Sequence, residues 1–568
     1  MRKVAAVLFF IAALGMLAPP AFAQAPAPAP APKVTINGLV DFVATYYYNW
    51  SGTGGTGGLN SSDVTNVRDK GWYTRERGVF TITGEVGRSR GVWALELDFT
   101  NGAGLNNAGN AFNGGLQGPS FSGTSANFDE DIDVASVVET KWLYIETPAT
   151  GAGSFLPWIP FDSIIRVGGQ PARGHDYKNG MQFSGDFPGI NLSTNWTPDI
   201  RSTLTFVQIA AKLDPITAQG NRQNWATLGS LEMDVFKGFT VKPTYSYIWM
   251  MGGSCNANAA ATGSSLGNPN AGGVQLNDCG AVLPSSPLLT QRNTIGGDVR
   301  WVFGGFSLQP TFLYQFGTFQ TFNLAPGQFI NPATGLPSAF NNLGKRTADV
   351  SAFIFDTIAG YRIGPLNIQG RIMYTSGQNA QSNIQNGANQ QYYRAINSAF
   401  GYMAGWSDIQ TGGIDYITAA MVGIPGLTLR ESPSYDKYGR VWFGLASDYA
   451  LTPALTFTGL VNTSFTPYKV NTRSILTANG LAQCPNVPTA GFGNCTSDGR
   501  GTEQYIGTEG ALGMTYRFAP NIALDLIGSY MFTGAALDNA GVVGGLIGPN
   551  PRDSKDIFKL SSRLRFTF

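Results

Sequence analysis

Residues 559–568 alternate between apolar and polar side chains, apart from Ser562, and this ending constrains the fold more than any other feature of the chain. Successive side chains of a strand point to opposite faces, so one face carries Leu560, Leu564, Phe566 and Phe568. The other face carries Lys559, Arg563, Arg565 and Thr567. A strand that is apolar on one side and charged on the other suits a barrel wall with lipid outside and water inside.

The N-terminal residues predict export. Arg2 and Lys3 precede an apolar run over residues 4–17, and Ala21-Phe22-Ala23 forms a small-x-small cleavage site. We therefore expect a signal peptide over residues 1–23, with an uncleaved membrane anchor as the alternative. Residues 24–32, rich in Ala and Pro, predict an extended periplasmic tether of about 3.1 Å per residue. A segment that docks a partner is the alternative reading of this tether.

The composition fits one large membrane domain over residues 33–568. No later stretch reaches the roughly 18 consecutive apolar residues that a spanning helix needs. A membrane protein without such a helix has to close its sheet into a barrel, because open edges cannot face lipid. Only 13% of the residues are charged, against about 25% in typical soluble domains. Cleavage after residue 23 would leave 35 basic and 36 acidic residues, which excludes a nucleic-acid binder driven by bulk charge.

Strand-like alternation recurs along the whole domain, with a polar second face in each segment. It is found in residues 34–43, 80–86, 93–99, 292–303, 366–375 and 509–518. A soluble sandwich also alternates, but here aromatic residues gather at the strand ends, as in the girdles at the two membrane interfaces. These aromatic residues are Tyr46, Tyr48, Trp72, Tyr247, Trp249, Trp301, Tyr314, Tyr449, Phe518 and Tyr530.

Short turns alternate with long polar links, as in an up-and-down barrel with short periplasmic turns and long outer loops. The long links lie near residues 51–71, 101–135, 252–290, 318–346, 377–436, 466–504 and 534–555. We predict an all-β, transmembrane, antiparallel up-and-down β-barrel of about 18 strands, or 16 if one hairpin is misread. The less secure strands lie near residues 136–147, 162–170, 189–196 and 200–212, and the turn at 148–161 is longer than the others. Over residues 349–361 the sequence does not show which side chains face lipid and which face the lumen, so we expect a bulge or a wrong strand boundary there.

Together these features resemble a Gram-negative outer-membrane porin, with local echoes in residues 36–41, 77–85 and 165–170. The resemblance implies that the barrel-assembly machinery reads the terminal Phe566 and Phe568. It also implies an outer-membrane location among lipid and lipopolysaccharide, and a homotrimer. In such porins the third outer loop folds into the lumen and forms the constriction. Here that loop follows the fifth strand, and the constriction candidates are Arg166, Arg173, Asp176 and Lys178. The acidic stretch typical of this loop is missing.

Strand phase predicts a further set of charged side chains in the lumen, since Lys or Arg facing lipid at the midplane costs about 2–4 kcal/mol. These are Glu96, Asp98, Lys242, Asp298, Arg300, Arg371, Arg440, Asp448, Glu509, Arg517, Asp525, Arg563 and Arg565. The near balance of charge predicts mild ion selectivity, slightly anionic if the basic constriction residues dominate.

The link at 377–436 is too long for a passive loop. Tyr393, Ile396, Phe400 and Met403 fall at helical spacing and predict a short helix on the barrel rim, with a plug or binding element entering the mouth as the alternative.

The four cysteines predict two disulfides, each within one outer loop: Cys255–Cys279 and Cys484–Cys495. The other two pairings would bridge different loops. There is no CxxC pair, so we expect no zinc site and no other cofactor. We expect no enzyme activity, because His175 is the only histidine and no Gly-x-Ser-x-Gly elbow stands out.

The leading functional hypothesis is a water-filled porin for passive diffusion of ions and small hydrophilic solutes. The alternatives are a substrate-selective uptake porin for sugars, carboxylates or phosphate, and a structural or adhesive barrel with a plugged lumen.

Overall fold

The computed structural model describes most of the predicted strands and parts of the links between them. The described residues are 31–49, 70–102, 132–133, 138–151, 153–172, 175–178, 181–183, 186–212, 222–251, 289–322, 345–377, 389–393, 395–396, 406–410, 439–470, 475–476, 482–483, 503–537, 542–543, 546–547 and 555–568. The signal-peptide prediction, Arg173 and the four cysteines lie outside them.

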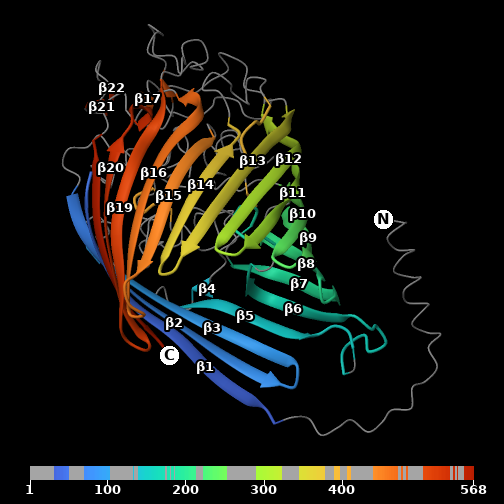
Figure 1. The fold of residues 1–568 in the computed structure, drawn as a ribbon. Helices are drawn as coiled ribbons and strands as arrows, with labels where there is room; N and C mark the ends of the chain where they lie inside the picture. The colour runs from blue at the N-terminus through green and yellow to red at the C-terminus, as the bar shows by residue number, and fades with distance from the viewer. Residues whose placement is uncertain are drawn as a thin grey trace.

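Eighteen long antiparallel strands form the wall (Figure 1). They are β1 (Lys33–Tyr48), β2 (Lys70–Val86), β3 (Ser89–Gly102), β5 (Val138–Pro148), β6 (Asp162–Pro171), β7 (Asp186–Thr197), β8 (Ile200–Lys212), β9 (Arg222–Phe236), β10 (Phe239–Met251), β11 (Leu289–Phe303), β12 (Phe306–Phe322), β13 (Lys345–Ile363), β14 (Leu366–Thr375), β15 (Arg440–Ala450), β16 (Leu455–Val470), β19 (Glu503–Ala519), β20 (Ile522–Thr533) and β23 (Ile557–Thr567). Short accessory elements are β4 (Ile132–Asp133), the pair β17 (Ile475–Leu476) and β18 (Ala482–Gln483), the pair β21 (Val542–Val543) and β22 (Leu546–Ile547), and a 3-10 turn at Ala535–Leu537.

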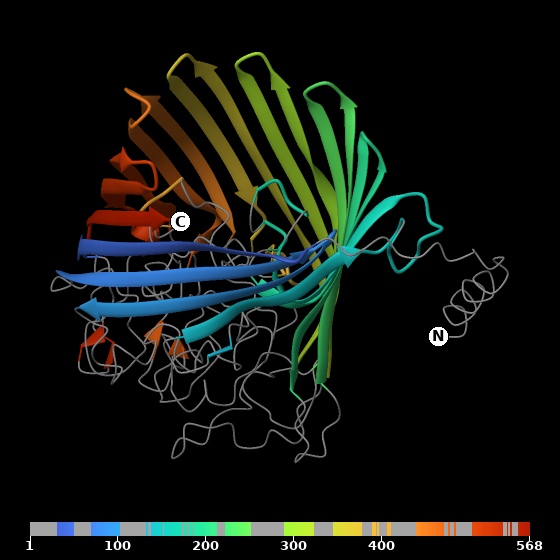
Figure 2. The same ribbon diagram turned by 90° about the horizontal axis from the view of Figure 1, so that it is seen from below.

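Each wall strand pairs with its neighbours in sequence, and the last strand pairs with the first. The register between β1 and β23 runs from Leu39 opposite Thr567 to Tyr48 opposite Phe558. Figure 2 shows the red C-terminal strands beside the blue β1. The barrel is therefore closed, which confirms the predicted fold class, the count of eighteen and the four less secure strands.

The two faces of the wall differ in chemistry, as alternation requires. Large apolar side chains are exposed on the outward face of every part of the wall, among them Phe42, Leu143, Leu204, Ile295, Leu445, Leu512 and Leu564. Polar and charged side chains are buried on the inward face, among them Asp41, Thr45, Glu96, Asp298, Asp356, Glu509 and Lys559. Among the described residues, no helix is long and apolar enough to cross a membrane.

The expected bulge in residues 349–361 is wrong. β13 pairs with β12 in unbroken register from Lys345, opposite Phe322, to Tyr361, opposite Phe306. The phase is ambiguous in the sequence because both faces are apolar here. Phe355 is exposed on the outward face, while Val350 and Ile354 are buried on the inward one. Side chains from two links that enter the barrel cover this inward face.

Two links fold into the barrel (Figure 2). Their apolar side chains and those of the inner wall form the core. The first is the β6–β7 link, described at residues 172, 175–178 and 181–183. The second is the β14–β15 link, described at residues 376–377, 389–393, 395–396, 406–410 and 439. One cluster comprises Met181, Leu313, Ala352, Ile354, Met373, Tyr393, Ala395, Trp406 and Trp442. The other comprises Phe183, Phe187, Val207, Ala226, Leu228, Ile248 and Ile396.

Candidate pore constriction

The β6–β7 link is a compact turn held by its own carboxylate. Asp176 Oδ2 accepts hydrogen bonds from the backbone N–H groups of Gln182 at 2.9 Å and Phe183 at 3.2 Å. The side-chain Nε2 of Gln182 donates to Ser246 Oγ of β10 at 3.1 Å. On the other side of the turn, His175 Nε2 lies 2.6 Å from Thr205 Oγ1 of β8. The turn is thereby fixed against the inner wall.

Lys178 anchors the same link further round the wall. Its Nζ donates to the backbone oxygen of Asp356 at 2.9 Å and lies 3.4 Å from Asp356 Oδ1. Arg371 of β14 binds the same carboxylate, with Nε at 3.0 Å and a terminal nitrogen at 2.5 Å from Oδ2. All three side chains are almost completely buried. Two cations around one buried carboxylate keep the link in place and leave a net positive charge there.

Tyr177 joins the link to a third group of charges. Its backbone N–H donates to Asp298 Oδ2 of β11 at 3.2 Å. The Lys242 ammonium lies 4.6 Å from the centre of its ring, a cation–π distance. Lys242 also pairs with Glu232 of β9 at 3.1 Å. The link therefore contacts charged side chains on three consecutive strands.

Burial shifts the titration of the link's own side chains. It lowers the pKa of His175 to about 3, and the nearby Lys242 charge acts in the same direction. It raises the pKa of Asp176 to about 7, with a further contribution from Asp298. It also lowers the pKa of Lys178, against the attraction of Asp356. At neutral pH His175 is therefore uncharged.

The first described part of the β14–β15 link lies inside the barrel against β13 and the β6–β7 link. The Gln390 N–H donates to Asp349 O at 2.8 Å, and Gln390 O accepts from the Ser351 N–H at 2.9 Å. Tyr393 OH donates to Met181 O at 2.8 Å, which joins the two links. Tyr393 and Ile396 are not helical and lie inside the barrel, so the predicted rim helix is wrong at these two residues. The other two residues of that prediction, Phe400 and Met403, lie outside the described residues.

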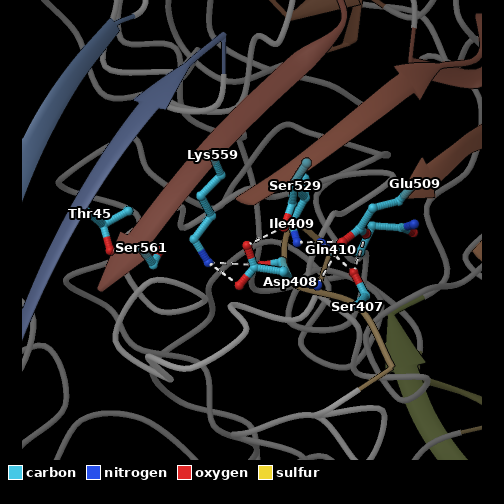
Figure 3. A network of polar contacts seen from close by, with 9 residues as sticks. All are labelled: Thr45, Ser407, Asp408, Ile409, Gln410, Glu509, Ser529, Lys559 and Ser561. Carbon is cyan, nitrogen blue, oxygen red and sulfur yellow. Dashed lines mark hydrogen bonds and ion pairs between the residues drawn. The ribbon is translucent and has the colours of Figure 1, made fainter. Parts of the chain in front are cut away.

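The second described part, residues 406–410, is a turn fixed to β16, β19, β20 and β23 of the wall (Figure 3). The Glu509 carboxylate of β19 accepts from the N–H groups of Asp408 at 2.7 Å and Ile409 at 3.0 Å, and also from the Ser407 hydroxyl. Lys559 Nζ of β23 lies 2.9 Å from Asp408 Oδ1 and 3.0 Å from Asp408 O. The turn is therefore bound by one carboxylate and one ammonium that project from the wall.

Gln410 completes the attachment of this turn. Its amide nitrogen donates to Asn462 Oδ1 of β16 at 3.1 Å, and its amide oxygen accepts from Ser464 Oγ at 3.0 Å. Asn462 in turn donates to the backbone oxygen of Trp406 at 3.0 Å.

The wall from β2 to β7 carries a chain of alternating charges at its inner face. Glu96 of β3 pairs with Arg77 and with Lys141, and Lys141 reaches Asp186 at 3.3 Å. On the neighbouring part of the wall, Glu146 of β5 binds Arg90 at 2.8 Å and Arg166 at 2.6 Å. Side chains in both groups stay partly exposed: Arg90 at 34% and Arg77 at 17%. Solvent therefore reaches this face of the interior.

Apart from Asp98, the remaining predicted lumen residues share the inward phase of their strands. Asp525 of β20 binds Arg563 at 3.0 Å and Arg565 at 2.8 Å. Asp448 accepts from Thr458 at 2.9 Å, and Arg440 is buried. Arg300 and Arg517 are exposed, and Asp98 lies opposite Arg77 in the register.

Of the four constriction candidates, the structure joins Asp176 and Lys178 in one link, while Arg166 pairs separately with Glu146. Sequence reasoning missed Asp356, Asp408, Glu146 and the partner role of Lys559. Asp356 falls in the strand of ambiguous phase, and Asp408 falls in the link for which a helix was predicted.

No family model matches this sequence, and no curated protein matches it. Solved structures with a similar chain path include Pseudomonas aeruginosa OccK5 (OpdH), with a TM-score of 0.41 and 10% identity over 94% of this chain and 98% of that one. A BenF-like porin from Pseudomonas fluorescens Pf-5 gives a TM-score of 0.42 at 8% identity, again over 94% and 98%. Pseudomonas aeruginosa OccK8 (OprE) gives 0.40 at 9% identity, with the same coverage. At these TM-scores and identities the likenesses carry no argument about function.

Proposed function

We propose that this protein is an outer-membrane porin, a closed barrel whose wet interior lets ions and small hydrophilic solutes diffuse passively. The observation that carries the proposal is a charged inner face that stays partly open to solvent beside the two inward links. Arg90, Arg77 and Lys141 on β3, β2 and β5 are 34%, 17% and 16% exposed, and Arg565 on β23 is 32% exposed. A closed barrel with an apolar outward face and a solvated, charged inner face has the organisation of a channel.

The charge network on the inner face from β2 to β7 supports a mild preference for anions. Its interacting charges are four basic and three acidic side chains: Arg77, Arg90, Lys141 and Arg166 against Glu96, Glu146 and Asp186. The excess is one positive charge. A single excess charge in a solvated pore biases the local ion concentration only weakly.

Reversal potentials in planar bilayers under a salt gradient test this proposal. Wild-type channels should show a small anionic preference. Arg90→Gln removes the most exposed of these charges and should lower the anion-to-cation permeability ratio. The matched control is Lys237→Gln, an exposed side chain in the β9–β10 turn, which should leave the ratio unchanged. A strong cation preference in the wild type contradicts the sign of the selectivity.

A substrate-selective porin is the second candidate. The stack of Arg90, Glu146 and Arg166 on three adjacent strands supports it, with Arg166 also 4.4 Å from the centre of the Tyr144 ring. Such a fixed arrangement of charge favours solutes with a matching polar group. Saturable block of single channels by one class among carboxylates, phosphate and sugars supports selectivity, and equal passage of all three contradicts it.

The chemistry of the interior supports a channel rather than an enzyme. The only histidine of the chain, His175, is buried with Nε2 on Thr205 Oγ1, so it is committed to the fixed turn. Export by the N-terminal segment, insertion by the assembly machinery and a homotrimeric state belong to the same proposal. Fractionation of cell envelopes and native mass spectrometry of the purified protein test location and subunit number.

A further inference from the structure

The β5–β6 connection, residues 149–161, is the long member among the short turns, and it folds as an element of its own. The Ala149 N–H donates to Ser163 O at 2.8 Å, and the Leu156 N–H donates to Ala149 O at 2.9 Å. The turn between them reverses at Gly151 and Gly153, whose φ values of 87° and 78° suit glycine. This connection is hereafter the β5–β6 loop.

The β5–β6 loop covers the outward side of the wall. Ser163 has the strand phase of the exposed Val167, and Thr194 has the phase of the exposed Ile190 and Trp196. Even so, Ser163 and Thr194 are only 4% and 7% exposed, with their hydroxyls 2.9 Å apart. The Ser163 N–H donates to Thr150 Oγ1 of the loop at 2.8 Å. Figure 1 shows the loop standing out from the wall beyond the ends of β5 and β6.

The exposed side chains of the loop are apolar and aromatic. Phe155 is 83% exposed and Trp158 is 64% exposed. Residues 149–161 contain no charged residue and no histidine. The nearest ion pair, Arg88 with Asp162, lies at the base of the loop. An isolated charge-free aromatic tip is costly to leave in water.

The loop is continuous with the outward aromatic surface of the barrel. The Phe161 ring packs edge-on against Trp196 of β7, with 4.7 Å between centroids and 61° between planes. Trp196 belongs to the outward face, which faces lipid. Trp and other aromatic side chains favour the boundary between lipid tails and headgroups. The occupant that fits this surface is therefore the phospholipid of the leaflet beside the short turns.

We propose that the β5–β6 loop is a membrane foot: its tip, with Phe155 and Trp158, inserts among the phospholipid headgroups of the periplasmic leaflet. The membrane foot requires the barrel to lie in a membrane, but it does not require the barrel to conduct ions. A failed lipid crosslink therefore leaves the porin proposal standing, and an absent ionic current leaves the membrane foot standing.

Photo-crosslinking tests the membrane foot. The full chain with p-benzoylphenylalanine in place of Trp158 is reconstituted in phosphatidylethanolamine–phosphatidylglycerol vesicles, irradiated and analysed by intact mass. The expected product is the protein plus one phospholipid, in a yield several-fold above that of the same probe in place of Lys237, an exposed side chain of a short turn. Equal yields at the two positions overturn the proposal, and so does a crosslink between two protein chains.

A second measurement avoids any assembly defect of the labelled protein. Tryptophan fluorescence of the wild type minus that of Trp158→Phe isolates the Trp158 signal. Lipids brominated near the headgroup should quench this difference more strongly than lipids brominated near the chain ends. No quenching by either lipid overturns the proposal. The single-channel conductance of Trp158→Phe should equal that of the wild type, because the loop lies outside the barrel.

Discussion

Lys559→Met should loosen the turn at residues 406–410, and the magnitude follows from burial. Lys559 and Asp408 are both 0% exposed, and their charged atoms lie 2.9 Å apart. Removing one partner of a buried ion pair costs about 3–5 kcal/mol, because the other charge stays buried without its counterion. Asp408 would keep the Ser529 hydroxyl at 2.6 Å, which compensates only part of this cost.

Single-channel recording makes this loss measurable. A cost of about 3–5 kcal/mol changes the ratio of bound to released turn roughly a hundred- to several-thousandfold. Because the turn lies inside the barrel, its release should change the open cross-section. Lys559→Met channels should therefore fluctuate between conductance levels, whereas wild-type channels should hold one level.

The matched control is Arg565→Met on the same strand. Arg565 pairs with Asp525 at 2.8 Å but is 32% exposed, so its loss should cost less than about 1 kcal/mol and leave the current steady. Lys559→Met/Asp408→Asn should fluctuate less than Lys559→Met alone, because it removes the unpaired charge. If Lys559→Met matches Arg565→Met both in the steadiness of the current and in the free energy of unfolding, the Lys559–Asp408 ion pair does not hold the turn in place.

Three further predictions concern the inward links and the wall. His175 should show no NMR titration near its ordinary pKa of 6.5, since burial lowers its pKa to about 3, and a titration near 6.5 would contradict its burial. The contribution of the neutral imidazole to the free energy of unfolding is fully present above pH 6.5 and is lost as pH falls toward 3. Trp442→Ala should lower the free energy of unfolding by about 3–5 kcal/mol, because the indole is completely buried in the cluster under the links. Urea unfolding in micelles measures this loss, and a loss below about 1 kcal/mol argues against that packing. Gly168→Ala should destabilise the barrel by about 1–3 kcal/mol, because φ of Gly168 is +127° and a Cβ would meet the Leu143 carbonyl oxygen. The control is Gly84→Ala, whose Cβ would enter open space, and equal loss of the heat-modifiable band on gels for both variants would contradict the expected difference.

The sequence predicts the wall well because one physical rule governs it. A strand between lipid and water needs one apolar and one polar face, so its side-chain pattern has a period of two. The rule fails at β13, where the inward Ile354 packs with Tyr393 and Met181 of the links. The inward Val350 forms a β-bridge with Gln390 of the β14–β15 link. An apolar cover inside the barrel removes the contrast between the faces, and the sequence alone does not reveal that cover.

The candidate site was predictable in kind but not in detail. Strand phase is enough to assign Lys242, Asp298 and Asp525 to the interior. It does not give their partners, because these come from distant parts of the chain. Lys178 binds a residue 178 positions away, and Lys559 binds one 151 positions away. The constriction candidates show how partners escape sequence analysis, since Lys178 is bound to Asp356 and Arg166 is bound to Glu146.

Recording of single channels from the purified, folded protein with a panel of small solutes decides whether the barrel conducts. We expect an open channel with a weak preference for anions and passage of small hydrophilic solutes, because water reaches the charged wall around Arg90 and Glu146. Correctly folded protein that inserts into the bilayer and carries no ionic current would contradict this expectation, and would mean that the two inward links close the barrel.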